Sequence, residues 1–368
     1  MKTFLGLLFV TVVTQAADPG IVRDLSSRAT QLYEQARYAE AEPLLRQAVE
    51  FWEGLGLQNS LEHAIDLRNL GAVLRATGRY GEAEPLLQEA LRQLESLGAP
   101  GMETARAAYS LSSLYRVRGD LAKAESFAMR ASDLADKQPD LSVPERLAPR
   151  IVLASVYVEE RRFADAEAIL QPAIEGADGA LSVVIYDNLA TIAIARGEFE
   201  QAEGFARQAI YFANLALPKN HPAVAASWNN LAQACRFQGR YLEAEGAYRQ
   251  AIAAWENSLG PSHPDLAKGL TNLAAFFHER ERETAAEQLY SRAAAILERA
   301  FGRSDPRALT ARNELADVLR AERRYSESAR IERSTIAAME RILAPQDPRL
   351  QRAQANYARL LKETQSPK

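Results

Sequence analysis

Large, small and apolar residues recur along this chain at fixed distances from a short motif that typically ends in Ala-Glu. The motif begins with an anchor residue, which stands at Tyr38, Tyr80, Leu121, Phe163, Phe199, Tyr241, Glu283 and Tyr325. A leucine followed by a small residue lies ten residues before seven of these anchors, and an alanine lies ten residues after the first seven. Small residues at regular positions let two helix backbones approach closely, while leucines fill the space beside them. The pattern therefore predicts a pair of packed helices around each anchor.

The anchors follow one another at steps of 42, 41, 42, 36, 42, 42 and 42 residues. Eight copies at nearly constant spacing are typical of a repeat array in which each unit packs on its neighbours. Glycines stand two residues before four anchors, at Gly78, Gly119, Gly197 and Gly239, where a left-handed conformation ends a helix. Each repeat is therefore expected to contain two antiparallel helices, named helix A and helix B, with a tight turn before the anchor.

The junctions between repeats carry a second recurring pair. It reads His221-Pro222, His263-Pro264, Asp305-Pro306 and Asp347-Pro348. Proline suits the first position of a helix because its missing N–H would have no partner there, and aspartate before it is a good N-cap. The alternative for the two histidines is a ligand or a pH switch. The aspartates in the same slot favour the capping role.

These residues resemble the tetratricopeptide repeat, in the longer form of about 42 residues found in kinesin light chains and many bacterial proteins. The resemblance implies an all-α fold, a right-handed α-solenoid of stacked antiparallel helix pairs. We expect eight hairpin repeats over residues 18–348, a capping helix at 349–361 and a disordered tail at 362–368. The chain departs from the pattern at the 36-residue step after Phe163, at the anchor Glu283, and at Ser328-Ala329 in place of Ala-Glu.

The first residues have the features of a secretory signal. Lys2 is the only charge before Asp18, Phe4–Val13 is an apolar run, and a small residue, Ala16, follows. This run is shorter than the roughly 20 apolar residues that span a bilayer. We therefore expect a signal peptide at residues 1–16, export to the periplasm or the exterior of a bacterial cell, and no membrane span after its removal. A buried N-terminal helix of the fold is the alternative.

Composition narrows the classes of function. With 44 basic and 48 acidic residues the chain has a net charge of −4, which gives no argument for a nucleic-acid partner. A single cysteine, Cys235, excludes an intrachain disulfide framework, and four scattered histidines show no metal-ligand spacing. Phosphate-loop and nucleophile motifs are absent from the sequence. The sequence therefore predicts a protein that is not an enzyme and that uses no metal or cofactor.

Asparagines recur one or two positions before the leucines of helix A. The family resemblance places helix A on a concave face that commonly holds an extended peptide, and an amide can both donate to and accept from a peptide backbone. The members of this asparagine row are Asn69, Asn188, Asn229, Asn230, Asn272 and Asn313, with Asn356 continuing it in the capping helix. They are predicted to line the groove. The alternative is that they hydrogen-bond neighbouring helices inside the array.

Basic residues recur five positions before the anchors. This basic row consists of Arg75, Arg116, Arg236, His278 and Arg320. It predicts a basic groove that suits an acidic segment or a terminal carboxylate of the partner. The alternative is that the row pairs with the recurring glutamates of helix B, such as Glu42 and Glu84.

The favoured function is a non-catalytic scaffold that binds a peptide or partner protein in the groove lined by helix A. The alternative is a structural or assembly component of an envelope or secreted complex. A repeat scaffold hosts many functions, so the sequence leaves the identity of the partner and the oligomeric state open.

Overall fold

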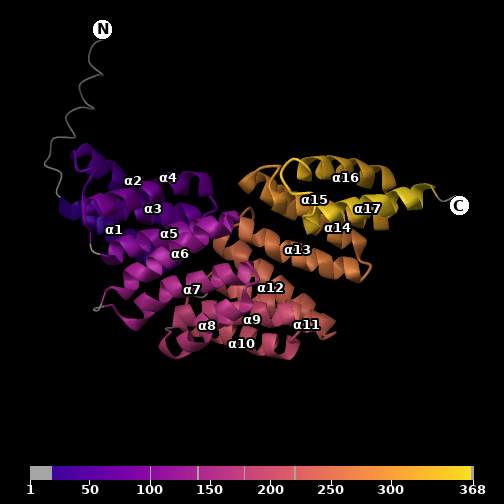
Figure 1. Cartoon of the computed structure of the whole chain (residues 1–368), viewed down its shortest axis with the longest axis horizontal. Helices are drawn as coiled ribbons and strands as arrows, with labels where there is room; N and C mark the ends of the chain where they lie inside the picture. The colour runs from indigo at the N-terminus through magenta and orange to yellow at the C-terminus, as the bar shows by residue number, and fades with distance from the viewer. Residues whose placement is uncertain (1–18, 100, 139–140, 178, 219–220, 366–368) are drawn as a thin grey trace, which may run out of the picture. The chain divides into compact units, whose positions relative to one another are not determined.

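The computed structural model describes residues 19–99, 101–138, 141–177, 179–218 and 221–365 (Figure 1). The expected signal peptide at residues 1–16 lies outside them. Every regular element in these ranges is helical, with seventeen α-helices and one 3-10 turn, Ile174–Gly176. The chain divides into two compact units, Met1–Leu181 and Ser182–Lys368. We describe each unit separately.

The first unit contains four antiparallel helix pairs. They are α1 (Pro19–Glu34) with α2 (Tyr38–Gly54), α3 (Leu61–Ala76) with α4 (Tyr80–Ser96), α5 (Gly101–Arg118) with α6 (Leu121–Asp136), and α7 (Val143–Glu159) with α8 (Phe163–Ala173). Within this unit α2 also packs on α3, α4 on α5 and α6 on α7. Successive A helices touch as well.

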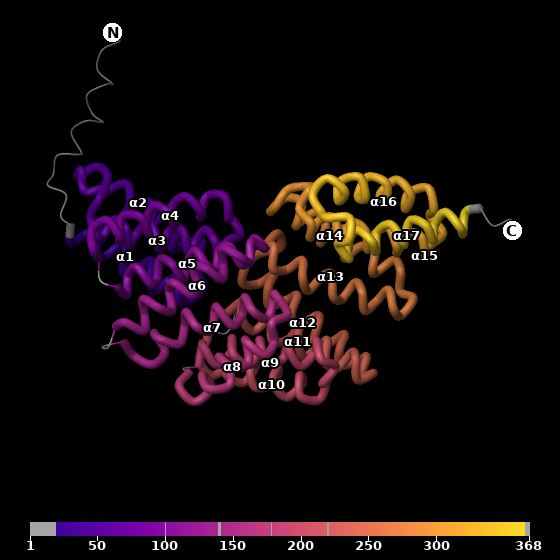
Figure 2. Tube along the Cα trace, in the orientation of Figure 1, coloured from indigo at the N-terminus to yellow at the C-terminus, as the bar shows by residue number. Residues whose placement is uncertain are grey.

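The second unit contains four more pairs and a final single helix. They are α9 (Gly179–Arg196) with α10 (Phe199–Ala216), α11 (Ala223–Phe237) with α12 (Tyr241–Leu259), α13 (Pro264–Glu279) with α14 (Glu283–Phe301), α15 (Pro306–Ala321) with α16 (Tyr325–Met339), and α17 (Pro348–Gln365). Figure 2 shows α17 beside α15 and α16, with which it is in contact. The predicted all-α array of stacked hairpins is confirmed in both units.

The last helix is longer than the sequence suggested. We expected a capping helix at 349–361 and a disordered tail from residue 362, but α17 continues to Gln365. Its inward face buries Leu350, Ala353 and Leu360. Beyond residue 361, Glu363 of this helix forms an ion pair with Arg320 of α15 at 2.8 Å. Residues 366–368 lie outside the described part of the chain.

All eight hairpin turns use the same left-handed residue two positions before the anchor. The four glycines predicted there have φ between 76° and 82°. Ala36, Arg161, Glu281 and Arg323 occupy the other four turns, with φ between 55° and 62°. The residue after each of these positions donates its N–H five residues back, as Arg79 does to the Leu74 carbonyl at 2.8 Å. This closure ends helix A and turns the chain into helix B.

The turns allow a matched pair of substitutions. Gly239→Ala is expected to destabilise the second unit by about 1 kcal/mol, because an alanine at φ 78° is strained although its Cβ would meet no atom within 4 Å. Arg323→Gly, at the exposed equivalent position, is expected to leave stability unchanged or raise it by up to about 1 kcal/mol. Thermal unfolding of the two variants measures both effects. Equal destabilisation by both would contradict this account of the turn.

The junction histidines and aspartates cap helices, as predicted. The Asp265 N–H donates to His263 Nδ1 at 3.1 Å, and the Ala223 N–H donates to His221 Nδ1 at 3.2 Å. Asp305 and Asp347 each accept from the N–H two residues on, both at 2.9 Å. The four residues therefore occupy one structural slot.

One helix of the second unit, α9, is long and apolar enough to cross a membrane by length and composition alone. Its residues Val183 and Tyr186 pack with Ala209 and Ala213 of α10. This is the ordinary contact of helix A with helix B in the array. A core helix passes the same compositional test, so the finding does not assign α9 to a membrane.

Candidate ligand-binding face

The asparagine row of the second unit is mostly buried, contrary to the prediction. Asn229, Asn230 and Asn313 are 0%, 4% and 2% exposed. Amides with so little accessible surface cannot hold a ligand in an open groove without rearrangement. The prediction that these three side chains face a groove is therefore wrong.

These buried amides connect successive A helices instead. The Asn272 Nδ2 donates to Asn229 Oδ1 at 2.9 Å, and the Asn230 Nδ2 donates to the Asp187 carbonyl oxygen at 3.2 Å. The first bond joins α13 to α11 and the second joins α11 to α9. Asn188 keeps part of its surface exposed. The structural alternative for the row therefore holds for the residues that form these bonds.

Asn69 is the member of the asparagine row in the first unit. It is partly exposed on α3, and its Oδ1 accepts a hydrogen bond from Arg68 Nη2 at 3.0 Å. Asn69 also lines a small cavity of about 50 Å³ together with Thr30 and Tyr33 of α1. Asn69 thus keeps an amide near a hollow on the helix A face of its unit.

Five of the recurring glutamates of helix B pair with arginines that lie outside the basic row. These arginines stand directly before the anchors. The pairs are Arg79–Glu42 at 2.6 Å, Arg162–Glu125 at 2.7 Å, Arg240–Glu203 at 2.7 Å, Arg282–Glu245 at 2.8 Å and Arg324–Glu287 at 2.8 Å. Each pair ties one hairpin turn to the preceding helix B. The alternative that the basic row uses these glutamates is therefore wrong.

Most of the basic row pairs with carboxylates of the A helices. Arg116, Arg236 and Arg320 each donate to a glutamate 43 residues further along the chain, namely Glu159, Glu279 and Glu363. These partners stand at the end of the next helix A, or of α17 for Arg320. The positive charge of the three arginines is therefore largely matched within the protein.

His278, the histidine of the basic row, lies between two acids. Its Nδ1 is 2.6 Å from Glu283 Oε2 and its Nε2 is 3.5 Å from Asp317 Oδ2. Hydrogen bonds to Asp317 and Glu283 raise the pKa of His278 to about 9 despite its partial burial. Burial acts to raise the pKa of Asp317, but hydrogen bonds from His278 and Arg320 outweigh it and lower the pKa to about 2. His278 is thus a charged structural residue at neutral pH.

Arg75 differs from the rest of the row. The residue 43 positions on is Arg118, and among the described residues no carboxylate pairs with Arg75. Its Nη2 donates to the Tyr33 hydroxyl at 3.2 Å, and its Nε is buried without a hydrogen-bond partner. Burial acts to lower the pKa of Arg75, but nearby phenol groups outweigh it and hold the pKa raised. The cation is therefore kept charged among tyrosines.

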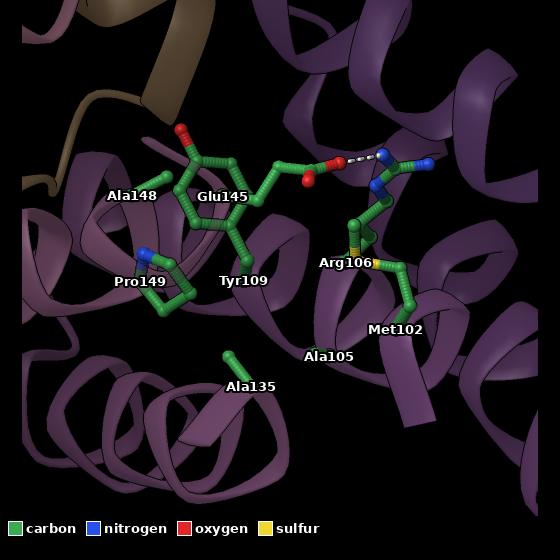
Figure 3. Close-up of a pocket in the computed structure, with 8 residues that line it drawn as sticks. All are labelled: Met102, Ala105, Arg106, Tyr109, Ala135, Glu145, Ala148 and Pro149. Carbon is green, nitrogen blue, oxygen red and sulfur yellow. Dashed lines mark hydrogen bonds and ion pairs between the residues drawn. The ribbon is translucent and has the colours of Figure 1, made fainter. Parts of the chain in front are cut away.

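The same unit contains an apolar hollow. A cavity of about 240 Å³ is lined by Met102, Ala105, Arg106 and Tyr109 of α5, Ala135 of α6, and Glu145, Ala148 and Pro149 of α7 (Figure 3). At its rim Arg106 Nη2 donates to Glu145 at 3.1 Å. Burial raises the pKa of Tyr109, while the charge of Arg75 acts to lower it. Tyr109 therefore lines the hollow and also lies within electrostatic range of Arg75.

The sequence analysis missed the two tyrosines, although the repeat register contains them. Tyr33 stands five residues before Tyr38, which is the first position of the basic row. Tyr109 stands twelve residues before Leu121, the position of Asn229 and Asn313 in later repeats. A row defined by one residue type does not include register positions that carry another side chain. In the described ranges no group of three or more His, Cys, Asp or Glu side chains is placed to hold a metal.

Five segments of the chain match a family model described as tetratricopeptide repeat, two that overlap at residues 25–96 and 62–137 and three that overlap at 181–257, 223–299 and 265–341. Together they cover well over half of the sequence, and this chain belongs to the tetratricopeptide repeat family. The last three matches begin 42 residues apart. The predicted repeats of the long, kinesin-light-chain type are therefore confirmed.

Three solved structures illustrate the likeness in fold. A Rap protein complexed with Competence and Sporulation Factor is 16% identical, with a TM-score of 0.60, over 93% of this chain and 97% of that one. The apo quorum sensor NprR from B. thuringiensis is 14% identical, with a TM-score of 0.60, and the match covers 89% of this chain and 90% of the NprR chain. A signal transduction ATPase with a tetratricopeptide repeat sensor, from Pyrococcus horikoshii, is 14% identical, with a TM-score of 0.58. The match covers 97% of this chain and 52% of the ATPase chain. No protein with a curated description matches this chain.

Proposed function

We propose that this protein is a non-catalytic scaffold that binds a partner protein or peptide on the helix A face of its first unit. The observation that carries the proposal is Arg75. Three other members of the basic row bond a glutamate 43 residues on, and His278 bonds two acids. Arg75 has a tyrosine hydroxyl as its hydrogen-bond partner instead.

The chemistry of this face suits an acidic group. A guanidinium presents several N–H donors in a plane and binds a carboxylate through two of them. The Tyr33 hydroxyl is bonded to the same guanidinium and can donate to a second oxygen of the carboxylate. An apolar side chain of the partner would fill the hollow lined by Met102, Tyr109 and Pro149. We therefore propose an acidic side chain or a terminal carboxylate beside an apolar residue as the recognised element.

The likeness in fold supports this reading. The Rap protein was solved in complex with Competence and Sporulation Factor, and NprR is named as a quorum sensor. Both have this architecture along nearly their whole length. A scaffold of stacked helix pairs that receives a signalling factor is thus one use of the fold, and we propose a comparable use here.

The proposal is tested with an immobilised peptide library in which each sequence is present with a free and an amidated C-terminus. We expect the chain to retain acidic or free-carboxylate sequences. Arg75→Leu should weaken their binding by tenfold or more, the effect of losing a hydrogen bond to a charged group. Arg75→Lys, which keeps the charge but not the planar fork, should recover part of the loss.

A matched control is Arg92→Leu on α4. Arg92 is exposed and pairs with Glu89 on its own helix, so its loss should leave binding unchanged. Circular dichroism of each variant separates lost binding from lost folding. Equal retention of peptides by the Arg75→Leu variant and the unchanged chain would disprove the proposed site.

We also propose export of the mature chain, which rests on the signal-like pattern of residues 1–16. Fractionation of cells that produce the full chain tests it, since an exported form would lack the first residues by mass spectrometry. A full-length form retained in the cytoplasm would contradict export.

A further inference from the structure

The third hairpin, α5 with α6, has an alanine where most other hairpins have a large buried side chain. The position lies fourteen residues after the anchor, near the end of helix B. Five hairpins have large residues there, each at most 8% exposed: Trp52, Leu94, Trp255, Leu297 and Met339. The third hairpin has Ala135, which is 1% exposed. It therefore lacks a side chain that fills the core of the others.

The two tryptophans show what surrounds this position. Trp52 packs in one apolar cluster with Val22 of α1, the helix A of its own hairpin. The Trp52 Nε1 also donates to Asp66 Oδ2 of α3 at 2.8 Å. In the sixth hairpin a Cβ on Gly269 of α13 would lie 2.6 Å from the Trp255 ring. The tryptophan at this position therefore packs on the helix A of the next hairpin.

The hollow of the first unit is bounded by the same register positions. Pro149 of α7 occupies the position of Asp66, fourteen residues before its anchor. Ala105 of α5 occupies the position of Val22, sixteen residues before its anchor. Both line the cavity of about 240 Å³ together with Ala135. The hollow is therefore the place where the repeat can hold an indole ring.

Two further hairpins also lack a large residue at this position. Helix B of the fourth hairpin ends at Ala173, before the position is reached. In the fifth hairpin the residue is Ala213, and Leu217 and Val224 pack against the buried cluster that contains it. An alanine at this position is therefore compatible with a filled core, and the hollow beside Ala135 is a particular feature of the third hairpin.

The size and lining of the hollow favour an aromatic occupant. An apolar cavity of roughly 150 Å³ holds benzene, so a cavity of about 240 Å³ accommodates the two fused rings of indole. A leucine side chain would leave part of this volume without contacts. The Tyr109 ring and the Met102 thioether line the hollow, and both groups make favourable contacts with an aromatic ring.

The hollow is accessible from solvent. Ala135 is buried, whereas Met102 and Tyr109 keep part of their surface exposed. At the rim Arg106 bonds Glu145, and these two side chains are 48% and 37% exposed (Figure 3). An apolar ring can therefore enter beside this pair while the polar backbone that carries the ring stays in solvent.

We propose that this hollow binds the indole ring of a tryptophan in the partner. The inference rests on the proposed function of the first unit and names the apolar residue that the partner inserts. The ring takes the place that Trp52 and Trp255 fill in their own hairpins. A side chain of the partner thus completes the core that the third hairpin leaves open.

Titration of the chain with three blocked amino acids, followed by calorimetry, tests the proposal. N-acetyl-tryptophanamide should bind at least tenfold more tightly than N-acetyl-leucinamide, and N-acetyl-alaninamide should show no saturable binding. Equal affinity for the tryptophan and leucine compounds would overturn the proposal. Free indole should compete with N-acetyl-tryptophanamide. Binding of free indole without binding of N-acetyl-tryptophanamide would also overturn it, because the ring would then belong to a free small compound.

Variants assign the binding to the hollow. Ala135→Trp supplies the ring from the chain itself, so it should abolish binding of N-acetyl-tryptophanamide and raise the thermal unfolding midpoint. Ala135→Leu introduces the residue found at Leu94 and Leu297 and should weaken binding at least tenfold, which provides a second variant if the larger ring prevents folding. Ala122→Trp, at an exposed position of the same helix, is the matched control and should bind as the unchanged chain does. Unchanged binding by a folded Ala135 variant would contradict the assignment.

Failure of this inference can be told apart from failure of the proposed peptide site. The blocked amino acids carry no charge, so their binding does not require the carboxylate recognition proposed for Arg75. If the three compounds bind alike while Arg75→Leu loses the acidic peptides, the indole site alone is wrong. If N-acetyl-tryptophanamide binds as expected while Arg75→Leu retains every peptide, the carboxylate site alone is wrong.

Discussion

Replacement of Glu332 by leucine is expected to stabilise the second unit by about 2–4 kcal/mol at pH 8. The position is fully buried, and its carboxyl oxygens have no hydrogen-bond partner. Leu45, Leu87 and Leu170 occupy the equivalent position in three other hairpins, where each is at most 1% exposed. A buried charge without a partner is costly, and a leucine there replaces that cost by apolar burial. Thermal unfolding and hydrogen exchange of the α15 and α16 amides measure the gain.

The control for this variant is Glu327→Leu. Glu327 is exposed on the same helix and bonds Arg324 at 2.8 Å, so its replacement should not raise stability. The reverse substitution, Leu87→Glu, should destabilise the first unit by several kcal/mol, since it places an unpaired carboxyl in an apolar core. If Glu332→Leu left the unfolding midpoint unchanged, the carboxyl would have to be satisfied in solution in a way the structure does not show.

The second unit is expected to lose stability as the pH rises from about 5 to 8. Burial raises the pKa of Glu332 from 4.5 to about 7 and that of Asp187 from 3.8 to about 7. A carboxyl whose pKa is raised on folding holds its proton more tightly in the folded state. Its stabilising effect is therefore complete below the unfolded pKa and is lost as the pH rises through the folded one. Each group accounts for roughly 3 kcal/mol over this range.

His278 acts in the same direction at higher pH. Its pKa is raised from 6.5 to about 9, so the stability it contributes is lost between these values. Asp317 has the opposite effect, because its pKa is lowered from 3.8 to about 2 on folding. The stability that Asp317 contributes is therefore lost only as the pH falls below about 4. Unfolding midpoints between pH 4 and 9 should therefore be highest between pH 4 and 5. Glu332→Gln and Asp187→Asn should each flatten the fall between pH 5 and 8, and a rise in stability toward pH 8 would refute the assignment.

The fold was predictable because the repeat pattern is a direct consequence of packing. Ala83 and Ala124 recur at one spacing since a larger side chain there would separate helix A from helix B. The left-handed turn was predictable where Gly78 or Gly239 marks it. The same turn was harder to predict at Arg161 and Arg323, because an arginine side chain does not indicate a positive φ. The last turn of α17 has no counterpart in the repeat pattern, so its extension to Gln365 was not predicted.

The binding face was harder to predict because exposure depends on the neighbouring repeat. Asn229 and Asn69 share a residue type and nearly the same position, yet the first is buried in a bond to Asn272 and the second is partly exposed. The partners of the basic row were present in the sequence as glutamates at a constant distance from Arg116 and Arg236. A comparison of charges between repeats, rather than within one, would have singled out Arg75.

The ties between each turn arginine and the preceding helix B bear on how such an array changes in length. Arg282 reaches Glu245, and Arg324 reaches Glu287 by the same geometry 42 residues later. If a segment of 42 residues were duplicated, the new copy would contain both an arginine and a glutamate of this kind. Its arginine would pair with the glutamate of the preceding repeat, and its glutamate would pair with the arginine of the following repeat. Gain or loss of whole hairpins in the interior of the second unit would therefore preserve these ties.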